Sequence, residues 1–425
     1  MKHSFFWFRR DLRLEDNTAL YSALAEKKNV IAVFIFDDAI LNELPRDDSR
    51  VTFIYNNLKK IHQQLKKYNS SLLVLKGDVH KVWESLLNEY EVDSIYYNKD
   101  YEPYAIDRDL KLNSLALSKG VDVFSFKDHV IFEESEIVKT DGNPYTVYTP
   151  YKNKWLSEYN GVRILPNIQF DNFCSVSFPF PLIEDIGFKT SRICVEDYNI
   201  DALDNYAIHR DYPILNATSK LGVHLRFGTI SIRQVLNQIS SNNEVFISEL
   251  IWREFFIQVL FHHPNVVHHN FRRKYDGITW LNEPNNFEQW QIGLTGYPLV
   301  DAGMRELNAT GYMHNRVRMV TAGFLCKHLL IDWKWGEAYF AQKLLDYELA
   351  SNNGNWQWAA GTGCDAAPYF RVFNPETQLK KFDKDLEYVK KWVPELGTDK
   401  YPKPIIEHSF ARKRAIEKYK KELLC

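Results

Sequence analysis

The chain has 425 residues and a formal net charge of −2, so it is long enough for two hydrophobic cores and has no overall positive charge to attract a polyanion. Its five cysteines, Cys174, Cys194, Cys326, Cys364 and Cys425, lie far apart without a CxxC pair, which argues against a disulfide framework or an iron–sulfur site. Any affinity for nucleic acid must therefore come from a local group of arginines and lysines.

The start of the chain, MKHSFFWFRRDLRLED, becomes charged after about five apolar residues, too few for the core of a signal peptide. No apolar run elsewhere approaches the roughly 18 residues of a membrane-spanning helix. We therefore expect a soluble, cytoplasmic protein that works as a monomer and does not enter a membrane.

Up to residue 130, five short apolar runs alternate with amphipathic stretches: SFFWF near Ser4, VIAVFIF near Val30, LLVLKG near Leu72, SIYYN near Ser94 and VDVFSF near Val121. This spacing predicts βαβ units in a Rossmann-like α/β domain over 1–130, with a five-stranded parallel sheet covered by helices on both faces. The first run leads into FRRDLRLEDN, which has no glycine to let backbone amides approach a pyrophosphate. The sheet should therefore not bind a dinucleotide in the usual way.

Residues 131–195 contain turn-rich segments such as TDGNPYTVYTP and FPFPLIED, which are typical of an interdomain linker. From 196 to 425 the patterns are helical, and no comparable strand run returns. We expect an all-helical second domain there. The basic segment ARKRAIEKYKK near the end fits a solvated helix better than a contact at the edge of DNA.

Three helical segments of this second domain place polar and aromatic side chains on defined faces. In ELIWREFF one face carries Glu249, Trp252, Arg253 and Phe256. In MHNRVRM, Asn315, Arg318 and Met319 share a face, whereas Arg316 points roughly the opposite way, so the two arginines should have different tasks. In NNGNWQW, Trp356 and Trp358 lie about 200° apart, so that one ring can be buried while the other faces a cleft.

Together with FWFRRDLRLEDN, TSKLGVHLRFGTIS, TGYPLVDAGMRELNATGYMHNRVRM and DYELASNNGNWQWAAGTGCDAAPYFRVFNP, these segments resemble the photolyase/cryptochrome family over nearly the whole chain. The details are most similar to its class I cyclobutane pyrimidine dimer photolyases. The resemblance implies an α/β domain followed by a helical domain that binds FAD. It also implies light-driven electron transfer from reduced FAD to a damaged pyrimidine pair flipped out of UV-damaged DNA.

Carried over by position, the resemblance assigns FAD binding to Tyr206, Thr218, Ser219, Lys220, Leu221, Gly222, Arg253, Arg318, Asp346, Glu348 and Asn352. Arg318 should pair with Asp346, and Asn352 should face the flavin N5 atom. Gly222 stands where the family has a serine in its phosphate-binding loop, and Glu348 stands where it has its second acidic residue. We therefore do not expect the hydroxyl contact that this serine makes to the cofactor.

The resemblance also names the residues that act on the substrate. Trp252 and Trp358 should clamp the flipped dimer, Glu249 should hydrogen-bond to the damaged base, and Asn315 and Met319 should complete this site. Arg210, Arg316 and Gln378 should contact DNA, and their contribution should be affinity instead of sequence choice. Trp356, Trp333 and Trp280 match the family's tryptophan chain for reducing the flavin.

Two further segments bear on whether the protein binds a metal ion or a second chromophore. HHPNVVHH brings four histidines together, but it lacks an obvious cysteine or acidic partner, and we expect no metal site. In the first domain, YNKDYEPYAIDRD places Tyr104 and Ala105 where folate-binding members carry polar residues. A second, light-harvesting chromophore should therefore be closer to a deazaflavin than to a folate, or absent.

The rival hypothesis is a cryptochrome-like blue-light photoreceptor without repair activity. The MHNR segment with Met319 favours dimer repair, because members that act on the (6-4) lesion carry histidine-rich residues there, and little chain follows to serve as a signalling tail. The WQW sequence ending at Trp358 disfavours the DASH cryptochromes, which prefer single strands. We therefore expect an enzyme, a deoxyribodipyrimidine photo-lyase.

Overall fold

The computed structural model describes residues 2–168, 170–215, 217–239 and 243–422, and the chain forms two compact units. The first unit comprises Met1–Glu136, Ser157–Tyr198 and Lys220–Ser240, and the second comprises Ile137–Leu156, Asn199–Ser219 and Ser241–Cys425. The chain thus passes between the units more than once, whereas the sequence predicts a single linker over 131–195. The functional domain boundaries stay a prediction.

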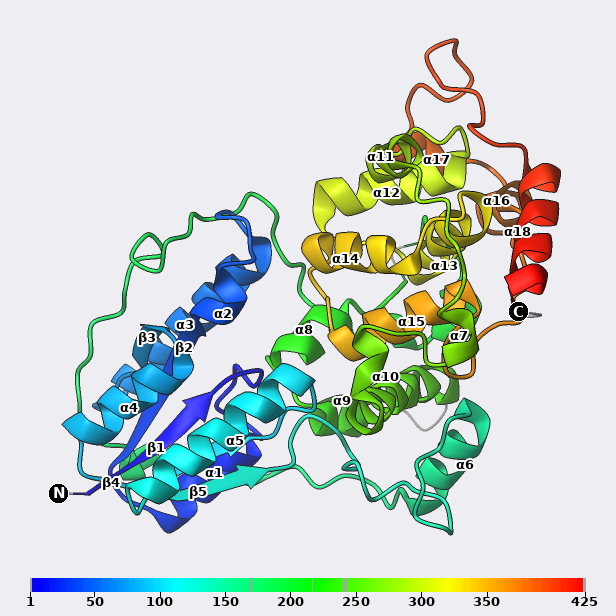
Figure 1. The fold of residues 1–425 in the computed structure, drawn as a ribbon. Coiled ribbons are helices and arrows are strands. Elements are labelled where there is room, and N and C mark those ends of the chain that lie inside the picture. Colours follow the sequence, from blue (N-terminus) through cyan, green and yellow to red (C-terminus); the bar gives the residue numbers. More distant parts are fainter. Residues whose placement is uncertain (1, 169, 216, 240–242, 423–425) are drawn as a thin grey trace. The chain divides into compact units, whose positions relative to one another are not determined.

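The first unit contains the predicted five-stranded parallel sheet, with the strand order β3-β2-β1-β4-β5. The five apolar runs form its strands: β1 (His3–Phe8), β2 (Val30–Asp37), β3 (Leu73–Gly77), β4 (Val92–Asn98) and β5 (Asp122–Phe126). The helices of this unit are α1 (Thr18–Glu26), α2 (Asp38–Leu41), α3 (Ser49–Lys66), α4 (Val79–Glu89), α5 (Pro103–Ser118), α8 (Leu221–Phe227) and α9 (Ile232–Gln238). Figure 1 shows the strands as arrows with helices packed along them.

Helices cover both faces of this sheet, as the continuous apolar runs predict for parallel strands. Successive side chains of a strand point to opposite faces. In β4, Tyr97 belongs to the core cluster that includes Trp83 of α4 and Leu112 of α5. The hydroxyl of its neighbour Tyr96 donates instead to Glu26 of α1, at 3.0 Å.

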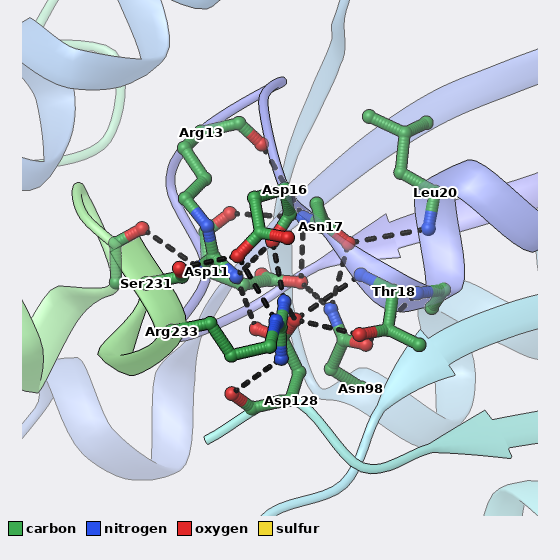
Figure 2. A network of polar contacts seen from close by, with 12 residues as sticks. Asp11, Arg13, Asp16, Asn17, Thr18, Leu20, Asn98, Asp128, Ser231 and Arg233 are labelled. Carbon is green, nitrogen blue, oxygen red and sulfur yellow. Dashed lines mark hydrogen bonds and ion pairs between the residues drawn. The ribbon is translucent and has the colours of Figure 1, made fainter. Parts of the chain in front are cut away.

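The segment that follows β1 carries a buried network of charges instead of a glycine loop (Figure 2). Asp128 lies 2.5 Å from a guanidinium nitrogen of Arg13 and 2.8 Å from one of Arg233. Asp16 accepts hydrogen bonds from Ser231 and Arg233. Although burial opposes ionisation, the two arginines hold the pKa of Asp128 below its ordinary value. This network ties the β1 loop to α9.

The second unit is helical, and among the described residues all five strands belong to the first unit. Its helices are α6 (Tyr148–Glu158, which ends in the first unit), α7 (Tyr206–His209), α10 (Glu244–His262), α11 (Pro284–Ile292), α12 (Pro298–Thr310), α13 (Asn315–Gly323), the π-helical turn η5 (Phe324–His328), α14 (Trp333–Lys343), α15 (Leu349–Ala360), α16 (Pro375–Phe382), α17 (Glu387–Trp392) and α18 (His408–Glu422). Figure 1 shows α15 lying beside α10 and below α13 and α14.

Two glycines allow α15 to pack closely against its neighbours. A Cβ atom on Gly336 of α14 would lie 2.1 Å from the Trp356 ring, and one on Gly354 of α15 would lie 2.2 Å from the Phe256 ring of α10. Backbones can approach this closely only where no side chain intervenes. These contacts hold α15, which carries several of the predicted site residues, closely against α14 and α10.

Candidate functional site

A cavity in the second unit is walled by α13, α14, α15 and the segment between α14 and α15. It encloses about 100 Å³, so a ligand as large as a dinucleotide would extend beyond these walls. The lining brings together many residues that the sequence analysis selected: Asn315, Arg318, Met319, Asp346, Glu348, Asn352, Trp356 and Trp358.

An ion pair between α13 and the start of the α15 segment forms one wall. Arg318 donates from Nη2 to Asp346 Oδ2 at 2.9 Å and from Nε to the carbonyl of Met313 at 2.7 Å. Although burial opposes the charge, Asp346 raises the pKa of Arg318 above its ordinary value. Asp346 Oδ1 is buried and accepts no hydrogen bond. A buried carboxylate oxygen without a donor suits a ligand that brings an N–H or O–H group.

Asn352 is held in one orientation by α14. Its Nδ2 donates to the backbone carbonyl of Glu337 at 3.1 Å and to Glu337 Oε1 at 2.9 Å. Burial raises the pKa of Glu337, against the effect of the hydrogen bond from Asn352. Because both amide hydrogens have acceptors on Glu337, the carbonyl oxygen of Asn352 is the polar atom that remains for the cavity. Sequence reasoning selected Asn352 but missed Glu337, which lies one helix away.

Glu348 connects α10 to the cavity. Its Oε1 lies 3.3 Å from Arg253 Nη2, and its Oε2 accepts a hydrogen bond from the Ser351 hydroxyl at 3.1 Å. Glu348 is buried, so this pairing compensates its charge. Glu348, which stands at the family's second acidic position, is thus paired with an arginine that the resemblance assigns to the flavin.

The aromatic residue of the α10 face has a neighbour that the sequence did not reveal. Trp252 stacks on Tyr148 of α6, with ring centroids 3.6 Å apart and planes 8° from parallel. The Tyr148 hydroxyl donates to the carbonyl of Ser248 at 2.7 Å and so fixes its own ring. The stacked partner holds the plane of the Trp252 ring, which a clamp for a flat base requires. No pattern in the sequence links residues so far apart in the chain.

Glu249 of α10 and Arg316 of α13 both form ion pairs with the segment that follows α7. Arg210 Nη1 lies 2.5 Å from Glu249 Oε1, and Arg316 Nη2 lies 2.6 Å from Asp211 Oδ1. Arg316 and Arg318 therefore have different partners, in agreement with their different faces on the helix. The role of each in binding stays a prediction.

The three tryptophans predicted to carry electrons meet in one core cluster. Trp333 and Trp356 are buried in it, and the partly exposed Trp280 packs against it. The indole N–H of Trp333 donates to Asn270 Oδ1 at 2.9 Å. Trp356 packs edge to face on Trp290, a fully buried ring that sequence reasoning did not select, at 6.1 Å between centroids. Trp358 is less buried and lines the cavity.

The other predicted cofactor residues lie in segments of both units. In the second unit, Tyr206 opens α7, and Thr218 lies with its Oγ1 3.2 Å from the Tyr312 hydroxyl, followed by the buried Ser219. Lys220, Leu221 and Gly222 belong to the first unit, where Lys220 has a φ of +56° and precedes α8. Gln378 lies on α16 in the second unit.

Two predicted absences and the antenna site can be compared with the described residues. Among them, no group of three histidine, cysteine or acidic side chains is arranged to hold a metal ion, and none of their helices combines the length and hydropathy needed to cross a bilayer. In the first unit, the Tyr104 hydroxyl donates to Asp37 at 2.5 Å, and Ala105 is buried at the start of α5. The identity of an antenna chromophore stays a prediction.

Known proteins share these features along the whole chain. Residues 4–169 match the DNA photolyase family, and residues 246–400 match the FAD binding domain of DNA photolyase. The chain is 37% identical to the deoxyribodipyrimidine photo-lyase of Halobacterium salinarum over 98% of both chains, and 34% identical to that of Escherichia coli over 97% of both.

Solved structures agree with this result. A class III photolyase from Agrobacterium tumefaciens superposes with a TM-score of 0.90 at 33% identity, covering 100% of this chain and 98% of its own. An archaeal photolyase from Sulfolobus tokodaii with two FAD molecules gives 0.88 at 36% identity, with coverage of 99% and 100%. A Synechocystis cryptochrome gives 0.89 at 24% identity, with coverage of 98% and 99%, which shows the shared fold alone.

Proposed function

This chain belongs to the photolyase/cryptochrome family, and from this premise we propose that it is a deoxyribodipyrimidine photo-lyase, which uses light to split cyclobutane pyrimidine dimers in DNA. The observation that carries the proposal is the cavity of the second unit, where a fixed amide, an ion pair and a tryptophan face the same space. These groups suit a flavin and a flat, extruded substrate at one site.

The donor set of the cavity fits FAD. Asp346 offers a buried oxygen that has no donor, Arg318 offers a cation beside it, and Asn352 offers a fixed carbonyl oxygen. The residues of the second unit that would hold the cofactor are Tyr206, Thr218, Ser219, Arg253, Arg318, Asp346, Glu348 and Asn352. When bound and reduced, FAD supplies the light-driven electron that breaks the cyclobutane ring, and the electron then returns to it. The protein positions the reactants and excludes water.

Two tryptophans of the unit suit a pyrimidine dimer. Trp358 lines the cavity, and Trp252 presents an indole whose plane is held by Tyr148. Base-sized planes stack on such rings, which compensates the stacking lost when the bases leave the duplex. Glu249 lies with its Oε1 2.5 Å from Arg210 Nη1, and its carboxyl oxygens can accept a hydrogen bond from a base N–H group. Asn315 and Met319 complete the cavity wall on the α13 side.

Further properties belong to the proposal. Arg210, Arg316 and Gln378 contact the DNA backbone, and Trp356, Trp333 and Trp280 pass electrons to the flavin from the surface. The protein acts as a cytoplasmic monomer, and any antenna chromophore is closer to a deazaflavin than to a folate. A photoreceptor without repair activity is the alternative, which the repair assay excludes or supports directly.

Repair under light tests the proposal. Chemically reduced protein is mixed with a duplex that contains one thymine dimer, and the restored thymines are measured by chromatography after near-UV or blue illumination and after darkness. Repair should occur only under illumination, and a duplex with a (6-4) lesion should stay unchanged. Absence of repair in light, or equal conversion in darkness, would overturn the assignment.

A pair of variants connects the activity to the cavity. Trp358→Ala should lose most of the affinity for the dimer, because base stacking on an aromatic ring contributes about 1–3 kcal/mol per base. Trp335→Ala on α14 is the matched control, since that ring is 36% exposed and does not line the cavity. Equal affinities in the two variants would remove Trp358 from the proposed clamp.

A further inference from the structure

Two consecutive residues of opposite charge, Arg210 and Asp211, are each paired with a different helix of the second unit. Arg210 reaches Glu249 of α10, and Asp211 reaches Arg316 of α13. These side chains keep between 20% and 38% of their surface exposed. Both arginines are proposed DNA contacts, and yet each already has a carboxylate partner within the protein.

The pairing of Arg316 uses the side of the guanidinium group that an oxyanion would take. Its Nε and Nη2 both donate to Asp211 Oδ1, at 3.2 and 2.6 Å. Its Nη1 lies 3.7 Å from the sulfur of Met319, and its centre lies 4.5 Å from the ring centroid of Phe382. The adjacent Nε and Nη2 donors form the fork that binds carboxylates and phosphates alike. A DNA phosphate at this fork must therefore displace Asp211.

We propose that Asp211 is an internal competitor for the DNA phosphate at Arg316, and that it lowers the affinity of the protein for undamaged backbone. The inference rests on the proposed DNA-binding function and adds a residue that opposes binding. Asp211 is not among the residues that line the cavity, so we expect its effect to be on the phosphate contact and to be independent of the bases.

The competition has a signature in the salt dependence of binding. An arginine that meets a phosphate releases a counterion from DNA, which contributes about 0.9 to the slope of log K against log salt concentration. When Asp211 loses Arg316 it acquires a cation from solution, and this uptake offsets the release. Arg316 therefore adds little to the slope in the wild-type protein. It adds its full contribution only when Asp211 is neutral.

The test compares Asp211→Asn with wild type for binding to a fluorescein-labelled, undamaged duplex in the dark, between about 50 and 200 mM NaCl. Anisotropy should show binding about two- to fivefold tighter, the range expected for loss of a partly exposed ion pair. The slope should become steeper by about 0.9. Asp204→Asn is the control, because it removes the same charge from an exposed position on the same segment.

A second background separates this inference from the function on which it rests. In Arg316→Ala, the change Asp211→Asn should have no more effect than Asp204→Asn. If Asp211→Asn matches its control in the wild-type background, or keeps its effect without Arg316, the competition does not exist. Arg316→Ala is also compared with its parent protein, once in wild type and once in Asp211→Asn. If it leaves the affinity for undamaged DNA unchanged in both, Arg316 is not a DNA contact, and that part of the proposed function fails instead.

Discussion

Replacement of Gly336 by alanine should destabilise the helical unit, because the added methyl group would enter the space of Trp356. The new Cβ would lie 2.1 and 2.4 Å from two atoms of that ring and 2.6 Å from a methyl carbon of Leu325. Trp356 is 2% exposed and Leu325 is fully buried, so neither side chain has free space to move into. Such overpacking typically costs about 1–3 kcal/mol.

Alanine also favours a helix over glycine by about 0.5–1 kcal/mol, so this gain must be removed from the comparison. Gly323 at the end of α13 provides the control, since its added Cβ would find only one carbon of Phe373, at an ordinary 3.8 Å. The propensity gain is common to both variants. The free energy of unfolding of Gly336→Ala should therefore be lower than that of Gly323→Ala by about the whole overlap cost of 1–3 kcal/mol.

Urea unfolding, followed by tryptophan fluorescence and by circular dichroism, measures this difference for the two variants under the same conditions. Both signals should give the same order of stability. If Gly336→Ala is as stable as Gly323→Ala, the close packing of α14 on Trp356 is not a constraint on the fold. In that case the rigid placement of this ring, on which its proposed electron-transfer role depends, would lose its support.

Trp356→Phe should slow photoreduction of the flavin several-fold and spare repair by chemically reduced protein, whereas a loss of both would mean that the ring has a structural role. Glu337→Leu should lower the two-electron reduction potential of bound FAD by about 10–30 mV, because Asn352 loses a hydrogen bond of about 0.5–1.5 kcal/mol that orients its amide. Glu337→Gln should restore the wild-type potential. Equal potentials in all three proteins would contradict this role of Glu337. Asp128→Asn should lower the free energy of unfolding by about 3–5 kcal/mol at neutral pH, because the buried Arg13 loses its carboxylate partner and Arg233 keeps only Asp16. The folded-state pKa of Asp128 is lowered, so this stabilisation is present above the ordinary carboxyl pKa and is lost as the pH falls below it; a difference from wild type that persists unchanged in acid would refute the argument.

The fold was predictable because its signals are local. The central strands β2 and β4 are largely buried and form short continuous apolar runs around Val30 and Ser94. The division of the chain between the two compact units was less accessible. The segment Lys220–Ser240 packs with the sheet through contacts such as Arg233 with Asp16, and no pattern within the segment records a partner more than 200 residues away.

The sequence predicted individual residues of the site, but it did not predict which residues they contact. Helical spacing placed Trp252 and Glu249 on one face of α10, and the resemblance to the photolyase/cryptochrome family predicted their roles. Their partners Tyr148 and Arg210 come from other segments. Such pairings depend on how helices cross, and one sequence does not encode that in any local period. The ion pair between Asp211 and Arg316 could not be predicted for the same reason, and no motif surrounds Asp211.

The placement of groups along α15 has a consequence for how the site can work. Asn352 and Trp356 are one helical turn apart, so their backbone positions differ by about 6 Å along the axis. The helix itself sets this spacing, and the close approaches at Gly336 and Gly354 prevent it from sliding or rotating against α14 and α10. The amide proposed to face the flavin and the first ring of the proposed electron path therefore belong to one rigid element. Electron transfer depends steeply on separation, and a helix packed closely against two neighbours keeps that separation constant.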